Sequence, residues 1–82
     1  MKKLGKQIAV LDRGFVYVGE VTVDGEFVTI AQARNIRRWG TTKGLGQLAE
    51  SGPTATTVLD SAGEVTVPLK AVIHLIKCAT SW

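Results

Sequence analysis

The sequence has few of the residues that build metal sites, disulfide frameworks or membrane spans. It contains one cysteine and one histidine among 82 residues, which excludes a disulfide scaffold, a zinc ribbon and a histidine cluster. No apolar run approaches the roughly 18 to 20 residues that span a bilayer. The run that begins at Ile8 stops at Asp12, which also argues against a signal peptide. We therefore expect a single domain over residues 1–82, located in the cytoplasm and without a membrane partner.

Residue combinations typical of catalysis are scarce as well. A structural role is expected for His74, and Cys78 on the same strand-like run is interpreted as a small buried hydrophobic residue. Neither residue forms a recognisable arrangement with a base or nucleophile. Three carboxylates crowd one hairpin (Glu20, Asp24 and Glu26), where solvation is expected rather than metal binding. The sequence thus predicts a non-enzymatic binding module without a cofactor.

Strand-forming residues dominate both ends of the chain. We expect strands over residues 7–11, 15–23, 26–33, 64–67 and 71–78, with a further short strand over 57–60. Asp24-Gly25 is a strong hairpin signal, and Val28 and Ile30 should face inward. Gly19 in the middle of the second strand suggests the sharp bend by which small barrels close.

The segment between the third and fourth strands differs in character. Leu45, Leu48 and Ala49 recur at helical spacing and predict a helix of about two turns, capped by Thr41 or Thr42. Beyond it, the turn-forming residues 61–63 should close the short strand. The expected order is therefore three meandering strands, a helical excursion and two closing strands.

The second strand suggests self-association. Phe15 and Tyr17 lie on one face and Val16 and Val18 on the other, so both faces are apolar. Covering a sheet on both sides needs more protein than so short a chain supplies, and we therefore expect a homo-oligomer. Trp82 is a further candidate for packing or subunit contact.

Positive charge is concentrated in one segment. The whole chain carries +3, but no acidic residue occurs between Glu26 and Glu50, where three arginines and one lysine fall. Guanidinium groups bind phosphate bidentately and an indole stacks on a base. The segment therefore predicts binding of a nucleotide or single-stranded nucleic acid through Arg34, Asn35, Arg37, Arg38, Trp39, Thr41, Thr42 and Lys43. The alternative is a solvated basic rim in which Trp39 anchors a loop to the core.

The glycines that follow Trp39 invite a second interpretation. Residues 40–46 fail the P-loop pattern because Lys43 precedes the glycine pair. A weaker expectation is that backbone N–H groups of residues 42–44, just before the helix, hold an anion. The alternative is that the glycines only allow the loop to turn.

Two blocks of the chain resemble Sm-like proteins. Residues 10–30, with the sequence VLDRGFVYVGEV followed by DG and FVTI, resemble the first Sm motif, and residues 63–73 resemble the second. The resemblance implies a mainly β fold: a small, strongly bent five-stranded Sm-like or SH3-like barrel, with one short helix between strands 3 and 4. It also implies a homo-oligomeric ring that binds RNA or nucleotides. Because Pro68-Leu69 replaces the Arg-Gly pair of the second motif, Sm-type RNA contacts are not transferred.

A second resemblance concerns the basic segment itself. Residues 34–46, RNIRRWGTTKGLG, together with Gly52-Pro53, resemble a block in a family of small bacteriophage and prophage proteins. That family brings no established activity, but the resemblance implies a phage origin and a place in the host cytoplasm. Two alternative functions stay open: counter-defence, by blocking a host protein or sequestering a small nucleotide signal, and a structural role in the virion or its scaffold.

Overall fold

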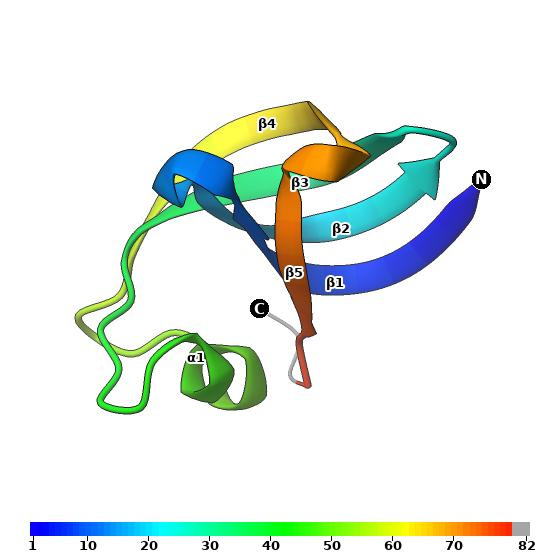
Figure 1. Cartoon of the computed structure of the whole chain (residues 1–82). Helices are drawn as coiled ribbons and strands as arrows, with labels where there is room; N and C mark the ends of the chain where they lie inside the picture. Colours follow the sequence, from blue (N-terminus) through cyan, green and yellow to red (C-terminus); the bar gives the residue numbers. More distant parts are fainter. Residues whose placement is uncertain (80–82) are drawn as a thin grey trace.

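Five antiparallel strands form one sheet in the computed structural model, which describes residues 1–79 (Figure 1). The elements are β1 (Lys2–Leu11), β2 (Val16–Asp24), β3 (Phe27–Arg38), α1 (Leu45–Ser51), β4 (Val58–Pro68) and β5 (Val72–Lys77). Short 3-10 turns at Asp12–Gly14 and Leu69–Ala71 form two of the corners. Across residues 1–79, no helix is long and apolar enough to cross a membrane.

The mainly β architecture confirms the expectation of five strands with one short helix between the third and the fourth. The strand order is β4-β3-β2-β1-β5, so β5 returns to pair with β1. That pairing covers Gln7–Leu11, while β4 pairs only with β3. Strands β4 and β5 are therefore two separate edges. The sheet curls strongly but does not close into the barrel that we expected, because β4 and β5 do not pair (Figure 1).

Strand boundaries differ from the sequence-based expectation at three places. Strand β1 begins at Lys2 instead of residue 7. Strand β3 continues to Arg38 instead of ending near Ala33, and β4 runs unbroken from Val58 through the predicted turn at residues 61–63. Gly63 has φ 70°, and the β3–β4 register shifts between Ala33 and Arg34. The residues expected to form a turn form a β-bulge instead, which bends the strand without ending it.

Buried side chains form two clusters on opposite faces of the strands. The helix cluster contains Ile8, Val16, Val18, Ile36, Leu48 and Ala49. The inner cluster, enclosed by the curled sheet, contains Ala9, Leu11, Val21, Val28, Ile30 and Ala33. Neighbouring residues of a strand point to opposite faces, so Ile8 joins one cluster and Ala9 the other.

The two clusters explain why β2 is apolar on both faces. Helix α1 covers Val16 and Val18, while Tyr17 packs against the inner cluster. The short excursion after β3 therefore supplies the cover that we had assigned to a second copy of the chain. A homo-oligomer stays a prediction, but this pattern does not require one.

Gly19 lies where the sheet bends. A Cβ atom at this position would lie 2.7 Å from Ile30 Cγ2 and 2.8 Å from the Ala31 carbonyl oxygen. The β2–β3 register shifts at this point, between Val18 and Glu20, and Gln32 adopts φ 53°. Glycine thus permits a close approach of two irregular strands, in agreement with the bend suggested by the sequence.

The remaining single residues lie near the C-terminal end. His74 is exposed on β5, and Cys78 is half-buried against the helix cluster. In the described part of the chain, no group of three or more His, Cys, Asp or Glu side chains could hold a metal ion. The prediction for Trp82 lies outside the described residues.

Candidate functional site

The predicted site residues divide between a strand and a loop. Arg34, Asn35, Arg37 and Arg38 belong to β3, whereas the other four lie in the loop before α1. The expectation of one continuous basic loop was therefore wrong for its first half. The reason is pairing with β4, which places Arg34 opposite Ser61, Asn35 opposite Asp60 and Arg38 opposite Val58.

Arg34 and Asn35 are neighbours on β3, but their side chains lie on opposite faces of the sheet. Arg34 lies opposite Val18 of the helix cluster and lines a polar hollow of about 450 Å³ with Lys6 and Glu20. Asn35 lies opposite Tyr17, on the face of the inner cluster. The two residues therefore serve different faces of the sheet. Sequence analysis missed Lys6, whose place depends on its pairing with Glu20 across β1 and β2.

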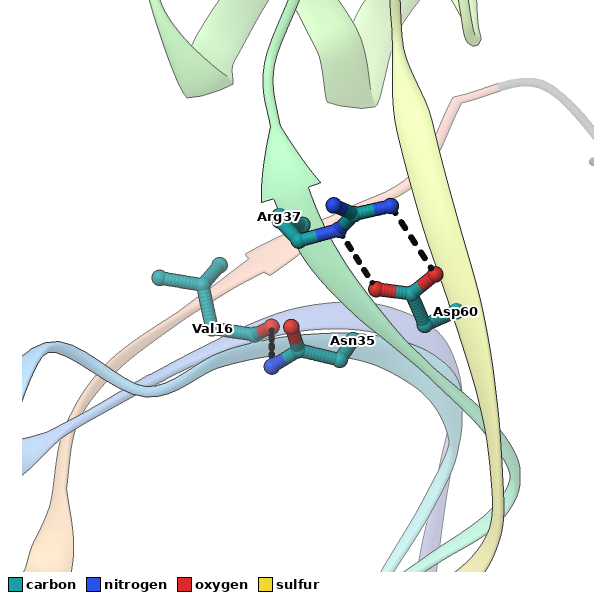
Figure 2. Close-up of polar contacts among 4 residues, drawn as sticks. All are labelled: Val16, Asn35, Arg37 and Asp60. Atoms are coloured by element: carbon teal, nitrogen blue, oxygen red, sulfur yellow. Dashed lines mark hydrogen bonds and ion pairs between the residues drawn. The ribbon is translucent and has the colours of Figure 1, made fainter.

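Asn35 also ties β3 to β2. Its side-chain Nδ2 donates a hydrogen bond to the Val16 carbonyl oxygen at 3.3 Å (Figure 2). The amide that we expected to read a base edge thus has one donor engaged within the fold. Its role in the free protein is to hold the start of β2 against β3.

Arg37 forms an ion pair that the sequence did not reveal. Its Nε donates to Asp60 Oδ2 at 2.8 Å and its Nη2 to Asp60 Oδ1 at 3.5 Å (Figure 2). The two side chains are 68% and 50% exposed, so the pair is solvated and of small energetic value. The segment is free of acids only along the chain, because β4 brings a carboxylate to it from the side.

Trp39 is held by its backbone rather than by its ring. Its carbonyl oxygen accepts a hydrogen bond from Thr57 Oγ1 at 2.7 Å, and the Gly40 carbonyl accepts one from Thr54 Oγ1 at 2.6 Å. The Trp39 side chain is 43% exposed, and its ring lies beside Gly44. The indole is therefore available at the surface and is not inserted into either cluster.

Gly40 is fitted closely into this connection. Its φ is 69°, and a Cβ atom there would lie 2.5 Å from the Thr57 backbone nitrogen. The chain entering the loop and the chain leaving it thus touch through backbone atoms. This contact fixes where Trp39 leaves the sheet.

The loop before α1 is organised by Gln47. The Lys43 N–H donates to Gln47 Oε1 at 2.9 Å, and the Thr42 hydroxyl lies 3.3 Å from the same oxygen. The Thr41 hydroxyl donates to the Gly44 carbonyl. The predicted threonine cap was wrong, because Gly44 is the N-cap and no side chain caps the helix.

These contacts also weaken the expected anion nest. One of its three N–H groups, that of Lys43, already has an internal acceptor. The Lys43 side chain itself remains exposed. The loop therefore offers an ammonium group at the surface rather than a cradle of backbone donors.

Two aromatic residues from which we had predicted self-association lie near this site. The rings of Phe15 and Tyr17 are stacked, with centroids 6.5 Å apart and an interplanar angle of 6°. Phe15 is 52% exposed. The register that places Tyr17 opposite Asn35 brings the pair to the end of the sheet that carries the arginines. The alternation of apolar residues indicated that Phe15 and Tyr17 share a face of the strand. Only the pairing of β2 with β3 reveals that Asn35 lies beside them.

Comparison with known proteins identifies one family. The chain matches the family described as Domain of unknown function (DUF6948) over residues 8–81 and belongs to it. No curated protein and no solved structure matches the chain.

Proposed function

We propose that this member of the DUF6948 family is a non-enzymatic module that binds single-stranded nucleic acid through residues 34–43, the basic segment. The observation that carries the proposal is the position of Trp39. Its ring is 43% exposed, its backbone is fixed by Thr57, and the exposed Arg38 precedes it. A surface indole beside cationic side chains is the combination that binds an unpaired strand by stacking and charge.

The spacing of the cationic residues favours a nucleic-acid strand over a single phosphate group as the ligand. Arg34 and Arg38 are four residues apart on β3, which corresponds to about 13 Å along a strand. Lys43 lies beyond them in the loop. Cations spaced along a line suit successive phosphates better than they suit one small anion.

The residues take different roles in this proposal. Arg38 and Lys43 contact phosphates, and Trp39 stacks on a base. Arg37 supplies a further guanidinium that exchanges Asp60 for a phosphate, because an exposed ion pair is easily replaced. Thr41 and Thr42 shape the loop rather than contact the strand, since their hydroxyls have partners within it.

The sequence resemblance suggests the setting. Because residues 34–46 resemble a block of phage and prophage proteins, we place this activity in the cytoplasm of an infected cell. A homo-oligomer would repeat the basic segment and strengthen binding through avidity. Native mass spectrometry of the protein isolated from cells tests the homo-oligomer and the bound nucleic acid, since it reports stoichiometry and retained ligands together.

The binding test uses fluorescence anisotropy with a labelled oligonucleotide of about 12 nucleotides. Affinity should fall steeply between about 50 and 200 mM salt. The double variant Arg38→Ala/Lys43→Ala should bind more weakly and reduce the salt slope by about 0.7 for each phosphate that is no longer neutralised. Trp39→Ala should weaken binding about 5- to 150-fold.

The control is Lys70→Ala. Lys70 is an exposed cation next to the end of β4 that pairs with Phe27, at the opposite end of β3 from Arg38. Lys70→Ala is compared with the single variant Arg38→Ala, which removes the same charge, and it leaves the basic segment untouched. Absence of binding at about 50 mM salt, or equal losses for Lys70→Ala and the Arg38 variant, would contradict the proposal. Recovery of a stoichiometric protein partner, with no oligonucleotide binding, would replace it with the blocking of a host protein.

A further inference from the structure

We infer that the stacked pair Phe15–Tyr17 is a second base-binding platform, which takes an unstacked base of the strand that the basic segment holds. The inference rests on the proposed function and extends the site from β3 to β2. The occupant is a nucleobase of single-stranded nucleic acid.

The platform has an exposed face and a fixed base. Phe15 is 52% exposed, while Tyr17 is partly buried against the inner cluster. The interplanar angle of 6° means that both rings present nearly parallel faces. Tyr17 therefore orients Phe15, and a third ring can add to the stack at little entropic cost.

The polar residues of the same row connect the platform to the basic segment. Residues directly opposite each other share a face of the sheet, so Tyr17, Asn35 and Asp60 form a row across β2, β3 and β4. The ion pair with Asp60 places the Arg37 side chain next to this row (Figure 2). A bound nucleic-acid strand that runs from Trp39 to Arg37 therefore reaches the edge of the platform.

A hollow beside the aromatic pair provides the space. Its volume is about 290 Å³, and its lining includes Asp12, Phe15, Tyr17, Val65 and Pro68. This volume is just below the usual range for small-molecule pockets, which fits one ring system rather than a whole nucleotide cofactor. The hollow exists because β4 does not pair with β5, so this side of the curled sheet stays open.

Charge favours a nucleic-acid strand as the occupant over an apolar peptide. The exposed Arg13 lies two residues before Phe15, and Arg37 is bound to Asp60, which lies opposite the Asn35 that pairs with Tyr17. Cations around exposed aromatic rings attract a polyanion and stack its bases. Stacking on a phenyl ring tolerates every base, so the platform should show little base preference.

The chain offers a matched control for this platform. Phe27 is 56% exposed, close to the 52% of Phe15, but it does not line the hollow, and it begins β3 whereas Arg38 ends it. Phe15→Ala should weaken binding of the oligonucleotide of about 12 nucleotides by about tenfold, whereas Phe27→Ala should change it less than about twofold. Phe15→Trp should retain the affinity, because it retains a stacking face.

Direct contact is tested by photo-crosslinking to an oligonucleotide that contains 5-iodouracil. Crosslinked peptides that include Phe15 or Tyr17 are expected, and their signal should fall in Phe15→Ala. Thermal unfolding of each variant shows that the comparison is made between folded proteins. Phe15→Leu provides a second variant that keeps apolar volume and removes the ring, and it should behave like Phe15→Ala.

The outcomes separate the inference from the function on which it rests. Equal affinities for Phe15→Ala and Phe27→Ala, with Trp39→Ala still impaired, would overturn the platform and leave the proposed function standing. Crosslinks confined to Trp39 would do the same. Failure of the unaltered protein to bind the oligonucleotide would overturn both.

Discussion

The two halves of β3 differ in charge and in burial. From Phe27 to Ala33 the strand carries no charge, and Val28 and Ile30 are fully buried. Their partners across β4 are Val67 and Val65. From Arg34 to Arg38 the strand carries three arginines, and only Ile36 is buried. One half therefore resembles the framework of a small β protein, and the other resembles a binding surface.

Irregular backbone lies between the two halves. The register shifts at Ile30–Ala33 and again at Ala33–Arg34, and Gly19 of β2 stands against the same place. Bulges re-aim side chains and increase the local twist. One long strand therefore contains a buried, uncharged part and an exposed, positively charged part, with the bulges as their boundary.

The largest effect should come from Ile30→Ala in the framework half. Ile30 is fully buried in the inner cluster, and truncation of such a side chain costs about 2–5 kcal/mol of unfolding free energy. Urea denaturation measures this loss. Oligonucleotide affinity, measured where the variant is still folded, should stay unchanged.

Thr29→Ala is the matched control for that variant. Thr29 is half-buried on the other face of β3 and should change stability by less than about 0.5 kcal/mol. A loss of affinity in folded Ile30→Ala would show that the two halves are coupled, contrary to the comparison.

A smaller but still clear effect is expected at the boundary itself. In Gly19→Ala the new methyl group would lie 2.8 Å from the Ala31 carbonyl oxygen, so backbone must shift. We expect a loss of about 1–3 kcal/mol of unfolding free energy. We also expect weaker oligonucleotide binding, because the bend that aims the second half of β3 is altered.

Gly46→Ala makes the same chemical change where there is space. Gly46 lies in α1, and a Cβ atom there meets nothing within 4 Å. Alanine should therefore stabilise the protein by up to about 1 kcal/mol. Equal destabilisation by both substitutions in thermal unfolding would mean that the close approach at Gly19 is not what matters.

Local patterns predicted the framework half well. The Asp24-Gly25 hairpin and the inward positions of Val28 and Ile30 are present, because turn chemistry and alternation depend on neighbouring residues alone. The helix that buries Leu48 and Ala49 was also correct. Each of these features depends on residues that are close together in the sequence, so a single sequence is enough to predict it.

The arrangement of the second half of β3 depends on contacts between distant segments, which the sequence alone did not reveal. Asp60 reaches Arg37 only because β4 runs through the residues expected to form a turn. The hydroxyl of Thr57 fixes Trp39 from 18 positions away. Gly63 signals a turn and a bulge equally well, and only the pairing with β3 decides between them. The residues of the candidate site could be named from the sequence, but their arrangement could not.

The smallest effect, Asp60→Asn, tests whether that shape restrains binding. The Arg37–Asp60 pair is exposed, so its loss should change the unfolding free energy by less than about 1 kcal/mol. Affinity for the oligonucleotide should rise about two- to threefold, because Arg37 is released and one repelling carboxylate disappears. Glu64→Gln provides the control, since Glu64 is an exposed carboxylate of the same strand, next to the Val65 that pairs with Ile30. If both variants bind equally more tightly, net charge alone acts, and the second half of β3 is not a separate binding surface. If only Asp60→Asn gains affinity, the Arg37 guanidinium is part of the site, and its ion pair with Asp60 weakens binding of the oligonucleotide.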